Sequence, residues 1–178
     1  AADLLSQAEH GADSQAMLVT SAESIVSPVV DAIQQQLSEL SRKDITAKAL
    51  EHSRIIVLKD EQEVIAFTNM YAPEHLIIQT ENYAHIAEQI ENAGSVFMGP
   101  YTPESAGDYA SGTNHTLPTN GYAKAYSGVN LDSFIKKITF QEITAEGIKN
   151  LGGTIQTMAG NEQLDAHRNA VTIRLKTI

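Results

Sequence analysis

The side chains that could do chemistry in this sequence fall in short groups of histidine, carboxylate and amide residues. Gln7 and His10 are three residues apart, so in a helix both side chains project from one face, as two ligands of one metal ion must. In the segment YAPEH, Pro73 stiffens the start of an expected strand, and Glu74 and His75 bring two proton-transfer groups to one end of a sheet. Each pair also has a plain structural interpretation: a surface Gln-x-x-His, and a Glu and His that only meet solvent where a strand begins.

A long segment over 99–128 is rich in Gly, Pro, Ser, Thr, Asn and Tyr and has no sustained hydrophobic period. Loops of this length are usually functional. This one carries Glu104, Asp108 and His115 among residues that are too small and polar for a core, and the Asp108 carboxylate suits an oxygen ligand. The alternative is that such carboxylates only form Asx turns and caps.

The other histidines give weaker signals. His52 at a helix end and His85 on an amphipathic helix fit partly exposed structural residues. Glu162 and His167 are five residues apart on the last expected helix, so they lie on different faces and by themselves indicate a surface. Because the sequence has no cysteine, any transition metal must use histidine, carboxylate or amide ligands.

Helices and strands alternate along the first part of the chain, as their hydrophobic periods indicate. Strands are expected over 16–20, 54–58, 76–79 and 95–98, and helices up to Gly11 and over 22–41, 44–51, 61–69 and 82–92. Strands joined by helical crossovers predict an α/β fold, an incomplete doubly wound (Rossmann-like) parallel sheet over 1–129 with ligands at the carboxyl ends of the strands.

The remaining residues, 130–178, form a C-terminal tail of a different character. Residues 135–143 (IKKITFQEI) look like a strand, and two helices are expected over 144–159 and 162–175. The apolar positions of these helices need a surface to cover. That surface could belong to a partner subunit or, equally, to the rest of the same chain.

Composition excludes several classes of function. The 12 basic and 22 acidic residues give a net charge of −10, which opposes binding to nucleic acid because no cluster of Lys and Arg could displace counterions. No apolar run approaches the roughly 18 residues of a membrane span and no signal peptide is visible, so we expect a cytoplasmic protein without a membrane partner. The chain has neither a Gly-rich dinucleotide fingerprint nor a Walker motif, so no cofactor-binding residue is expected in it. It begins as if inside a helix, with AADLLSQAEH, and we expect a fragment.

The sequence resembles histidinol dehydrogenase, a zinc- and NAD-dependent oxidoreductase that completes histidine biosynthesis, in four stretches: LLSQAEHGADSQA, YAPEHL, AGSVFMGPYTPESAGDYASGTNHTLPTNGYAKAYSG and LDAHRNAVTIRL. The resemblance covers essentially the whole chain but only the C-terminal portion of that family. It implies two successive NAD-dependent oxidations, of L-histidinol to L-histidinal and then to L-histidine. It also implies that the main NAD site lies in the missing amino-terminal portion, so that the fragment alone lacks activity.

The resemblance assigns roles to individual residues. The zinc ligands that it implies are Gln7, His10, Asp108 and His167. The residues that it implies for contact with the substrate are Gln7, His10, His75, Asp108, His115, Glu162 and His167. By the same resemblance His75 is the base that removes the alcohol proton, and Glu74 is the base that activates water. His167 and Glu162 then reach the site from the other subunit of a homodimer with a shared active site.

Two other readings stay open. The chain could be an acidic α/β dimerisation or interaction module without metal, which composition and periodicity permit. It could also hold a purely structural metal, although a site without cysteine and with a glutamine ligand favours an exchangeable, catalytic position. Convergence of Gln7, His10 and Asp108 in space separates the metal-binding readings from the interaction module.

Overall fold

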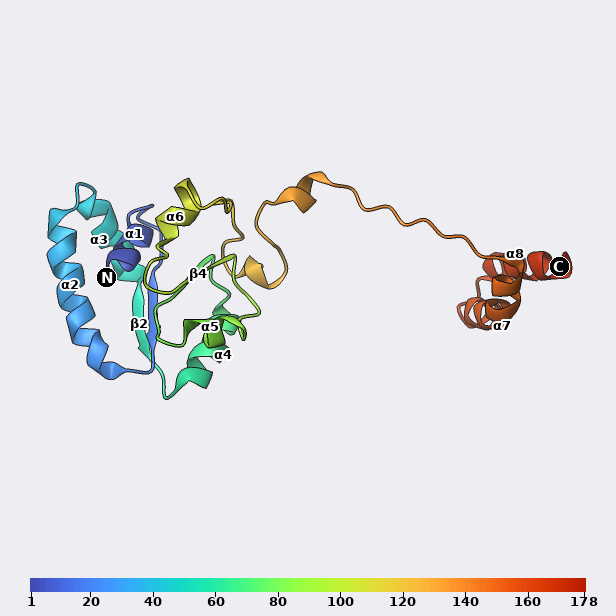
Figure 1. Ribbon diagram of the computed structural model, residues 1–178, viewed down its shortest axis with the longest axis horizontal. Helices are drawn as coiled ribbons and strands as arrows, with labels where there is room; N and C mark the ends of the chain where they lie inside the picture. Colours follow the sequence, from blue (N-terminus) through green and yellow to red (C-terminus); the bar gives the residue numbers. More distant parts are fainter. The chain divides into compact units, whose positions relative to one another are not determined.

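The first part of the chain alternates short helices and short strands, as a computed structural model that describes residues 1–178 shows (Figure 1). The structure divides into two compact units, 1–135 and 136–178, and each is described by itself. The elements of the first unit are, in chain order, α1 (Ala2–Ala8), β1 (Met17–Thr20), η1 (Glu23–Ile25), α2 (Val26–Glu39), α3 (Lys43–His52), β2 (Arg54–Val57), α4 (Glu61–Tyr71), β3 (His75–Ile78), α5 (Tyr83–Ala87), β4 (Ser95–Met98), α6 (Glu104–Tyr109), η2 (Tyr122–Lys124) and η3 (Leu131–Phe134), where η marks a 3-10 helix.

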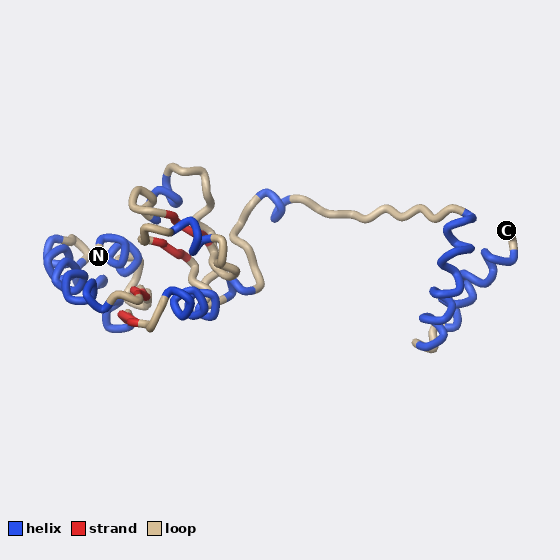
Figure 2. The backbone as a smooth tube through the Cα atoms, turned by 60° about the horizontal axis from the view of Figure 1, so that its bottom comes forward, coloured by secondary structure: helices blue, strands red, loops and turns tan.

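The four strands form two parallel pairs, drawn in red in Figure 2. β1 pairs with β2 from Met17 opposite Arg54 onward, and β3 pairs with β4 from His75 opposite Ser95 onward. Parallel strands require a crossover connection, which α2 and α3 supply for the first pair and α5 for the second. The predicted α/β class with parallel strands joined by helices is therefore confirmed, and the hydrogen bonds divide the strands into two pairs.

The apolar core of the second strand pair lies between β3 and two helices. Its buried members come one each from α4, β3 and α5: Ile65, Ile78 and Ile86. Leu76, Tyr83, Ala87 and Ile90 pack around them, partly buried. This cluster holds β3 in place, and β3 carries His75 at its first position.

The helix expected over 82–92 ends early, at Ala87. The reason is a side chain of α4. Asn69 donates a hydrogen bond to the Gln89 carbonyl at 2.9 Å and accepts one from the Glu91 backbone N–H at 2.8 Å. These contacts, and two more between Asn69 and Asn92, give residues 88–92 an alternative to the helical hydrogen bonds.

The second unit contains a helical hairpin of α7 (Ala145–Asn161) and α8 (Asp165–Lys176). Gly152 lets the two helices approach closely, because a Cβ there would lie 2.8 Å from Leu175 Cδ1. Gln156 Nε2 of α7 donates to Thr172 Oγ1 of α8 at 2.6 Å. The two helices of the predicted tail are thus confirmed, and none of the helices of the chain is both long and apolar enough to cross a membrane.

The strand predicted over 135–143 is wrong. These residues are exposed and have no strand hydrogen bonds. The apolar side chains on which the prediction was based are exposed to solvent, Ile138 to 70% and Phe140 to 89%. A period of two makes a strand only where another strand accepts its backbone hydrogen bonds, and no strand of the chain does so here.

Truncation of Ile78 tests the position of the core. Ile78 is 5% exposed, so Ile78→Ala should lower the free energy of unfolding by roughly 2–5 kcal/mol, measured by urea denaturation followed by circular dichroism. The matched control is Val57→Ala in β2, where the side chain is 44% exposed and the loss should stay below about 1 kcal/mol. Equal losses in the two variants would contradict this placement of the core.

Candidate metal and catalytic site

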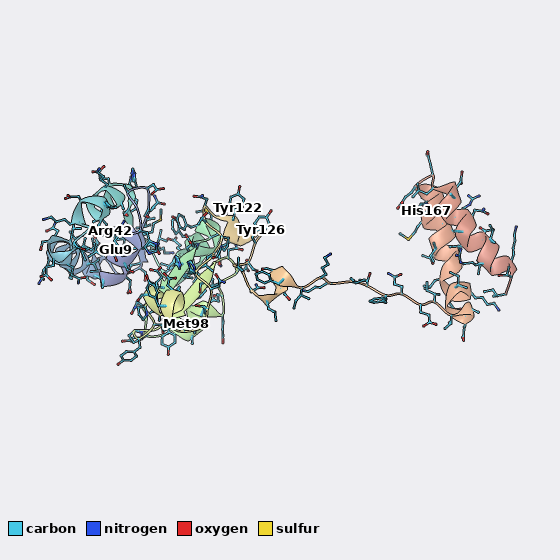
Figure 3. The ribbon with its side chains drawn as sticks, turned by 90° about the horizontal axis from the view of Figure 1, so that it is seen from above. Glu9, Arg42, Met98, Tyr122, Tyr126 and His167 are labelled. Carbon is cyan, nitrogen blue, oxygen red and sulfur yellow. The ribbon has the colours of Figure 1, made fainter.

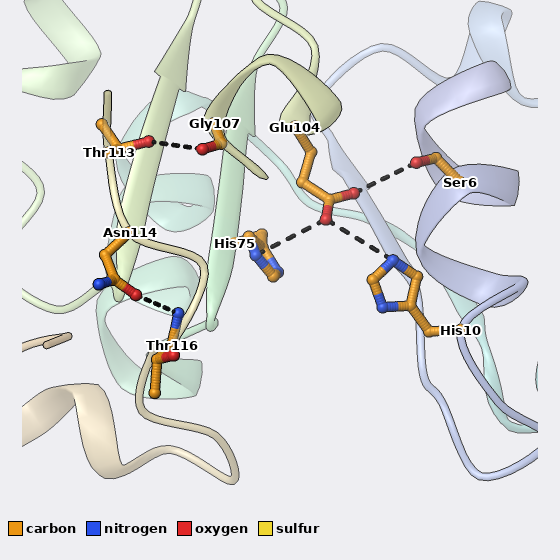
Figure 4. A network of polar contacts seen from close by, with 8 residues as sticks. All are labelled: Ser6, His10, His75, Glu104, Gly107, Thr113, Asn114 and Thr116. Atoms are coloured by element: carbon orange, nitrogen blue, oxygen red, sulfur yellow. Dashed lines mark hydrogen bonds and ion pairs between the residues drawn. The ribbon is translucent and has the colours of Figure 1, made fainter. Parts of the chain in front are cut away.

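Glu104, the first residue of α6, is a buried carboxylate with only 2% of its surface exposed. Pro103 precedes it in an extended conformation, which suits a residue at the start of a helix. Helix α1 packs against α6, and Ser6 Oγ on α1 donates a hydrogen bond to Glu104 Oε2 at 3.2 Å (Figure 4). Burial of a carboxylate away from water costs free energy unless other groups pair with it. The groups around Glu104 therefore indicate the chemistry of the site.

Two imidazoles face the other oxygen of Glu104. Glu104 Oε1 lies 3.7 Å from His75 Nε2 and 3.8 Å from His10 Nε2 (Figure 4). The His75 side chain is 9% exposed, whereas that of His10 is half exposed. Both distances suit ion pairs of protonated imidazoles and are too long for direct hydrogen bonds.

Three buried polar atoms of this group have no hydrogen-bond partner: His75 Nδ1, His75 Nε2 and Glu104 Oε1. Unpaired buried polar atoms are rare in folded proteins, and they concentrate where a ligand, an ion or a catalytic step supplies the missing partner. The orphaned atoms therefore make this group of residues a candidate functional site.

Asp108 extends the group by one helical turn. It follows Glu104 by four residues on α6, so both carboxylates lie on one face of that helix. His10, Glu104 and Asp108 each offer one ligand atom, and these atoms lie within 4.8 Å of one another. An imidazole nitrogen with two carboxylate oxygens is a donor set that suits Zn²⁺ and other divalent transition metals.

Phe97 of β4 supports both sides of the site. Its ring centroid lies 6.0 Å from that of His75, and the two planes are tilted by 36°. On α6, a Cβ at Gly107 would lie 2.7 Å from Phe97 Cε1, so only glycine allows the helix to approach this closely. Thr113 Oγ1 also donates to the Gly107 carbonyl at 3.2 Å, which fixes α6 from the side of the following loop.

The backbone holds the YAPEH segment firmly. Helix α4 ends at Tyr71, and the next residue, Ala72, adopts the left-handed conformation with φ 55°. The Glu74 carbonyl accepts a hydrogen bond from the Ser95 N–H at 2.9 Å. A Cβ at Gly94 would lie 2.5 Å from that carbonyl oxygen. At the head of the segment, the Tyr71 hydroxyl donates to Gln15 Oε1 at 2.7 Å, and burial raises the pKa of Tyr71 above 10.0.

The candidate site gathers at the amino end of β3. The expectation for a Rossmann-like sheet is a ligand at the carboxyl ends of the strands. His75 is instead the first residue of β3, so the group gathers at the amino end of that strand. The chain from β4 to α6 brings Glu104 to that end, and this position depends on tertiary contacts with α1 and Phe97.

The structure brings some of the predicted site residues together. His10 and Asp108 belong to the candidate metal cluster, and His75 faces the same buried carboxylate. Gln7 lies on α1 with a half-buried side chain that makes no hydrogen bond, and the half-buried Glu74 side chain makes none either.

Three other predicted site residues are exposed. His115 lies in the loop after α6. Glu162 is the residue that follows α7, and His167 lies on α8 (Figure 3). Both of the latter belong to the second compact unit. The assignment of individual residues as ligands, bases or substrate contacts therefore stays a prediction.

Sequence reasoning missed the role of Glu104. The composition of this segment predicts a loop that is too polar for a core, and this prediction is wrong for residues 104–109, which form α6 and bury Glu104 and Gly107. A signal was present in the sequence. Pro103 can begin a helix, and Glu104 and Asp108 have the spacing of neighbours on one helical face.

Fold and site together define an α/β protein with a histidine–carboxylate cluster that suits a divalent cation. The family model of histidinol dehydrogenase matches residues 1–175. The chain therefore belongs to the histidinol dehydrogenase family.

Curated relatives and a solved structure agree with this family. The chain is 65% identical over 178 residues to histidinol dehydrogenase from Bacteroides thetaiotaomicron and 54% identical to that from Aliivibrio fischeri. It spans 42% and 40% of the lengths of these two proteins. The crystal structure of histidinol dehydrogenase from Elizabethkingia anophelis matches with a TM-score of 0.91 at 58% identity, over 99% of this chain and 41% of that one.

Substitution of Gly107 tests the contact between α6 and β4. Gly107→Ala places a methyl group against the ring of Phe97 and should lower the free energy of unfolding by about 1–3 kcal/mol, measured by urea denaturation. The control is Gly153→Ala in α7, where nothing lies within 4 Å of the new Cβ and helix propensity should raise stability by up to about 1 kcal/mol. A neutral Gly107→Ala variant would show that α6 does not rest on Phe97.

Proposed function

We propose that this chain forms part of a histidinol dehydrogenase, an enzyme that oxidises L-histidinol through L-histidinal to L-histidine with NAD as electron acceptor. The observation that carries the proposal is the convergence of His10, His75 and Asp108 around the buried carboxylate of Glu104, in a chain of this family. An interaction module without metal has no need of buried, unpaired imidazole and carboxylate atoms.

The residues present fit a resident divalent cation. The His10 imidazole and the carboxylates of Glu104 and Asp108 each offer a ligand atom, and these atoms lie within 4.8 Å of one another. Glu104 Oε1 is buried without a hydrogen-bond partner, and the sequence has no cysteine that would compete for the metal. The proposed ligands are Gln7, His10, Asp108 and, from a second copy of the chain, His167. Zinc supplies positive charge that orients and polarises the substrate, and NAD accepts the hydride.

His75 and Glu74 divide the proton transfers between them. Loss of a hydride from an alcohol carbon leaves a hydroxyl proton, and the buried imidazole of His75 can take it. The second oxidation acts on the hydrated aldehyde, so a water must lose a proton as it adds to the carbonyl carbon. Glu74 precedes His75 and is half-buried, which suits a carboxylate base that still meets water.

The second unit supports a homodimer with a shared active site. Its helical hairpin leaves large apolar side chains exposed, on the two helices and in the turn between them: Leu151, Met158, Leu164 and Ile173. Such residues on one helical hairpin are typical of an interface. A partner subunit that covers them could receive Glu162 and His167 in its site, where Glu162 and His115 would contact L-histidinol.

Zinc content tests the metal centre. The protein, loaded with zinc and desalted, should retain close to one zinc per chain by mass spectrometry. Asp108→Asn should weaken zinc binding more than about tenfold, because it replaces an anionic ligand with a neutral one. The control Asp31→Asn removes the same charge from an exposed position of α2 and should leave zinc binding unchanged. Zinc-free wild-type protein would refute the metal centre.

Turnover in the complete protein tests the base. His75→Ala should lower kcat for L-histidinol oxidation by about 10²–10⁴-fold, followed as NADH absorbance, while zinc content stays as in the wild type. His85→Ala removes an imidazole from α5 and should leave kcat unchanged. A wild-type protein that reduces no NAD with L-histidinol would refute the proposed function.

A further inference from the structure

Glu104 has no chemical role of its own in the function proposed above, although it lies at the centre of the site and is the largest fully buried side chain of the protein. The proposed ligands and bases are other residues. A carboxylate buried this completely costs folding free energy unless cations or hydrogen-bond donors surround it. Its place beside two imidazoles therefore requires a reason.

The two oxygens of Glu104 have different surroundings. Oε2 accepts the hydrogen bond from Ser6 Oγ at 3.2 Å, which holds the carboxylate plane against α1. Oε1 has no hydrogen bond and lies at nearly equal distances from His75 Nε2 and His10 Nε2, 3.7 and 3.8 Å. One oxygen is anchored, and the other is presented to both rings.

We propose that Glu104 is a positioning residue that orients the His75 base and the His10 ligand through one shared carboxylate oxygen. Carboxylates behind catalytic or metal-bound histidines select the ring tautomer and fix the ring plane. A donor at His75 Nε2 facing Oε1 leaves His75 Nδ1 free to accept the substrate proton. Catalytic hydrogen bonds often tighten when substrate binds, and the distances of 3.7 and 3.8 Å leave Oε1 within reach of both rings for such a change.

This role couples the two halves of the chemistry. The same oxygen holds a proposed metal ligand and a proposed base, so a shift of Glu104 displaces both. The inference about turnover rests on the proposed function, whereas the orientation of the two rings does not.

The test replaces Glu104 with glutamine, which keeps the volume and removes the charge. In the complete protein, Glu104→Gln should lower kcat for L-histidinol oxidation by about 10–100-fold with KM changed less than threefold, and weaken zinc binding by about 10–100-fold. The ring ¹⁵N shifts of metal-free protein should show neutral His75 as the Nε2–H tautomer in the wild type. In the variant that preference should disappear and the His10 signals should move.

The matched control is Glu88→Gln, which removes the same charge from an exposed side chain without a hydrogen bond or ion pair. It should leave turnover and all histidine signals unchanged. If Glu104→Gln does not fold, Ser6→Ala removes only the anchor of Oε2 from a half-exposed position, and should shift the same His10 and His75 signals with a two- to fivefold loss of kcat.

Unchanged His10 and His75 signals in the folded Glu104→Gln variant, or in Ser6→Ala if that variant is needed, overturn the inference, whatever happens to turnover, because a purely structural role would not involve the rings. An active wild type with an equally active Glu104→Gln variant overturns it too and leaves the proposed function intact. A wild type that does not oxidise L-histidinol refutes the proposed function, and the nitrogen shifts still decide the role of Glu104.

Discussion

The burial of the Glu104 carboxylate is the constraint on which the site depends. Desolvation makes this charge expensive. One hydroxyl donates a hydrogen bond to Oε2, and two imidazoles lie 3.7 and 3.8 Å from Oε1. These partners come from α1, from the residues just after it and from the start of β3. The carboxylate therefore requires three separate segments to meet, and the candidate metal and catalytic residues meet with them.

Close packing around α6 fixes the relative positions of these segments. Phe97 touches α6 on one side and the His75 ring on the other, so the strand pair β3–β4 sets the distance between the His75 ring and the Glu104 carboxylate. Gly107 lets the helix approach the ring, and Asp108 then lies one turn beyond Glu104. Small residues in this segment serve close approach of backbone to ring, rather than flexibility.

The proposed site draws on residues of the second unit, supplied by a second copy of the chain. Glu162 and His167, which the family resemblance places at the substrate and the metal, belong to the compact unit 136–178 with its exposed apolar helices. The chain also spans only 42% of a curated relative's length. A shared dimeric site and an NAD site outside this chain are two parts of one proposal, in which residues 1–135 supply both bases and most metal ligands.

Local pattern by itself determined the helices and strands whose signal lies in their own residues: the strand Ser95–Met98 falls where the periodicity predicts it, and so does the α/β class. The motifs also indicated His10, His75 and Asp108 as candidate metal-binding or proton-transfer residues. Only tertiary structure decided the early end of α5 at the Asn69 side chain, the absence of a strand over 135–143, and the burial of Glu104. The physical reason is distance along the chain. Ser6 and Glu104 are 98 residues apart, so the hydrogen bond between them depends on contacts that a local sequence pattern does not contain. The free-energy cost of burying the Glu104 charge depends on those same contacts.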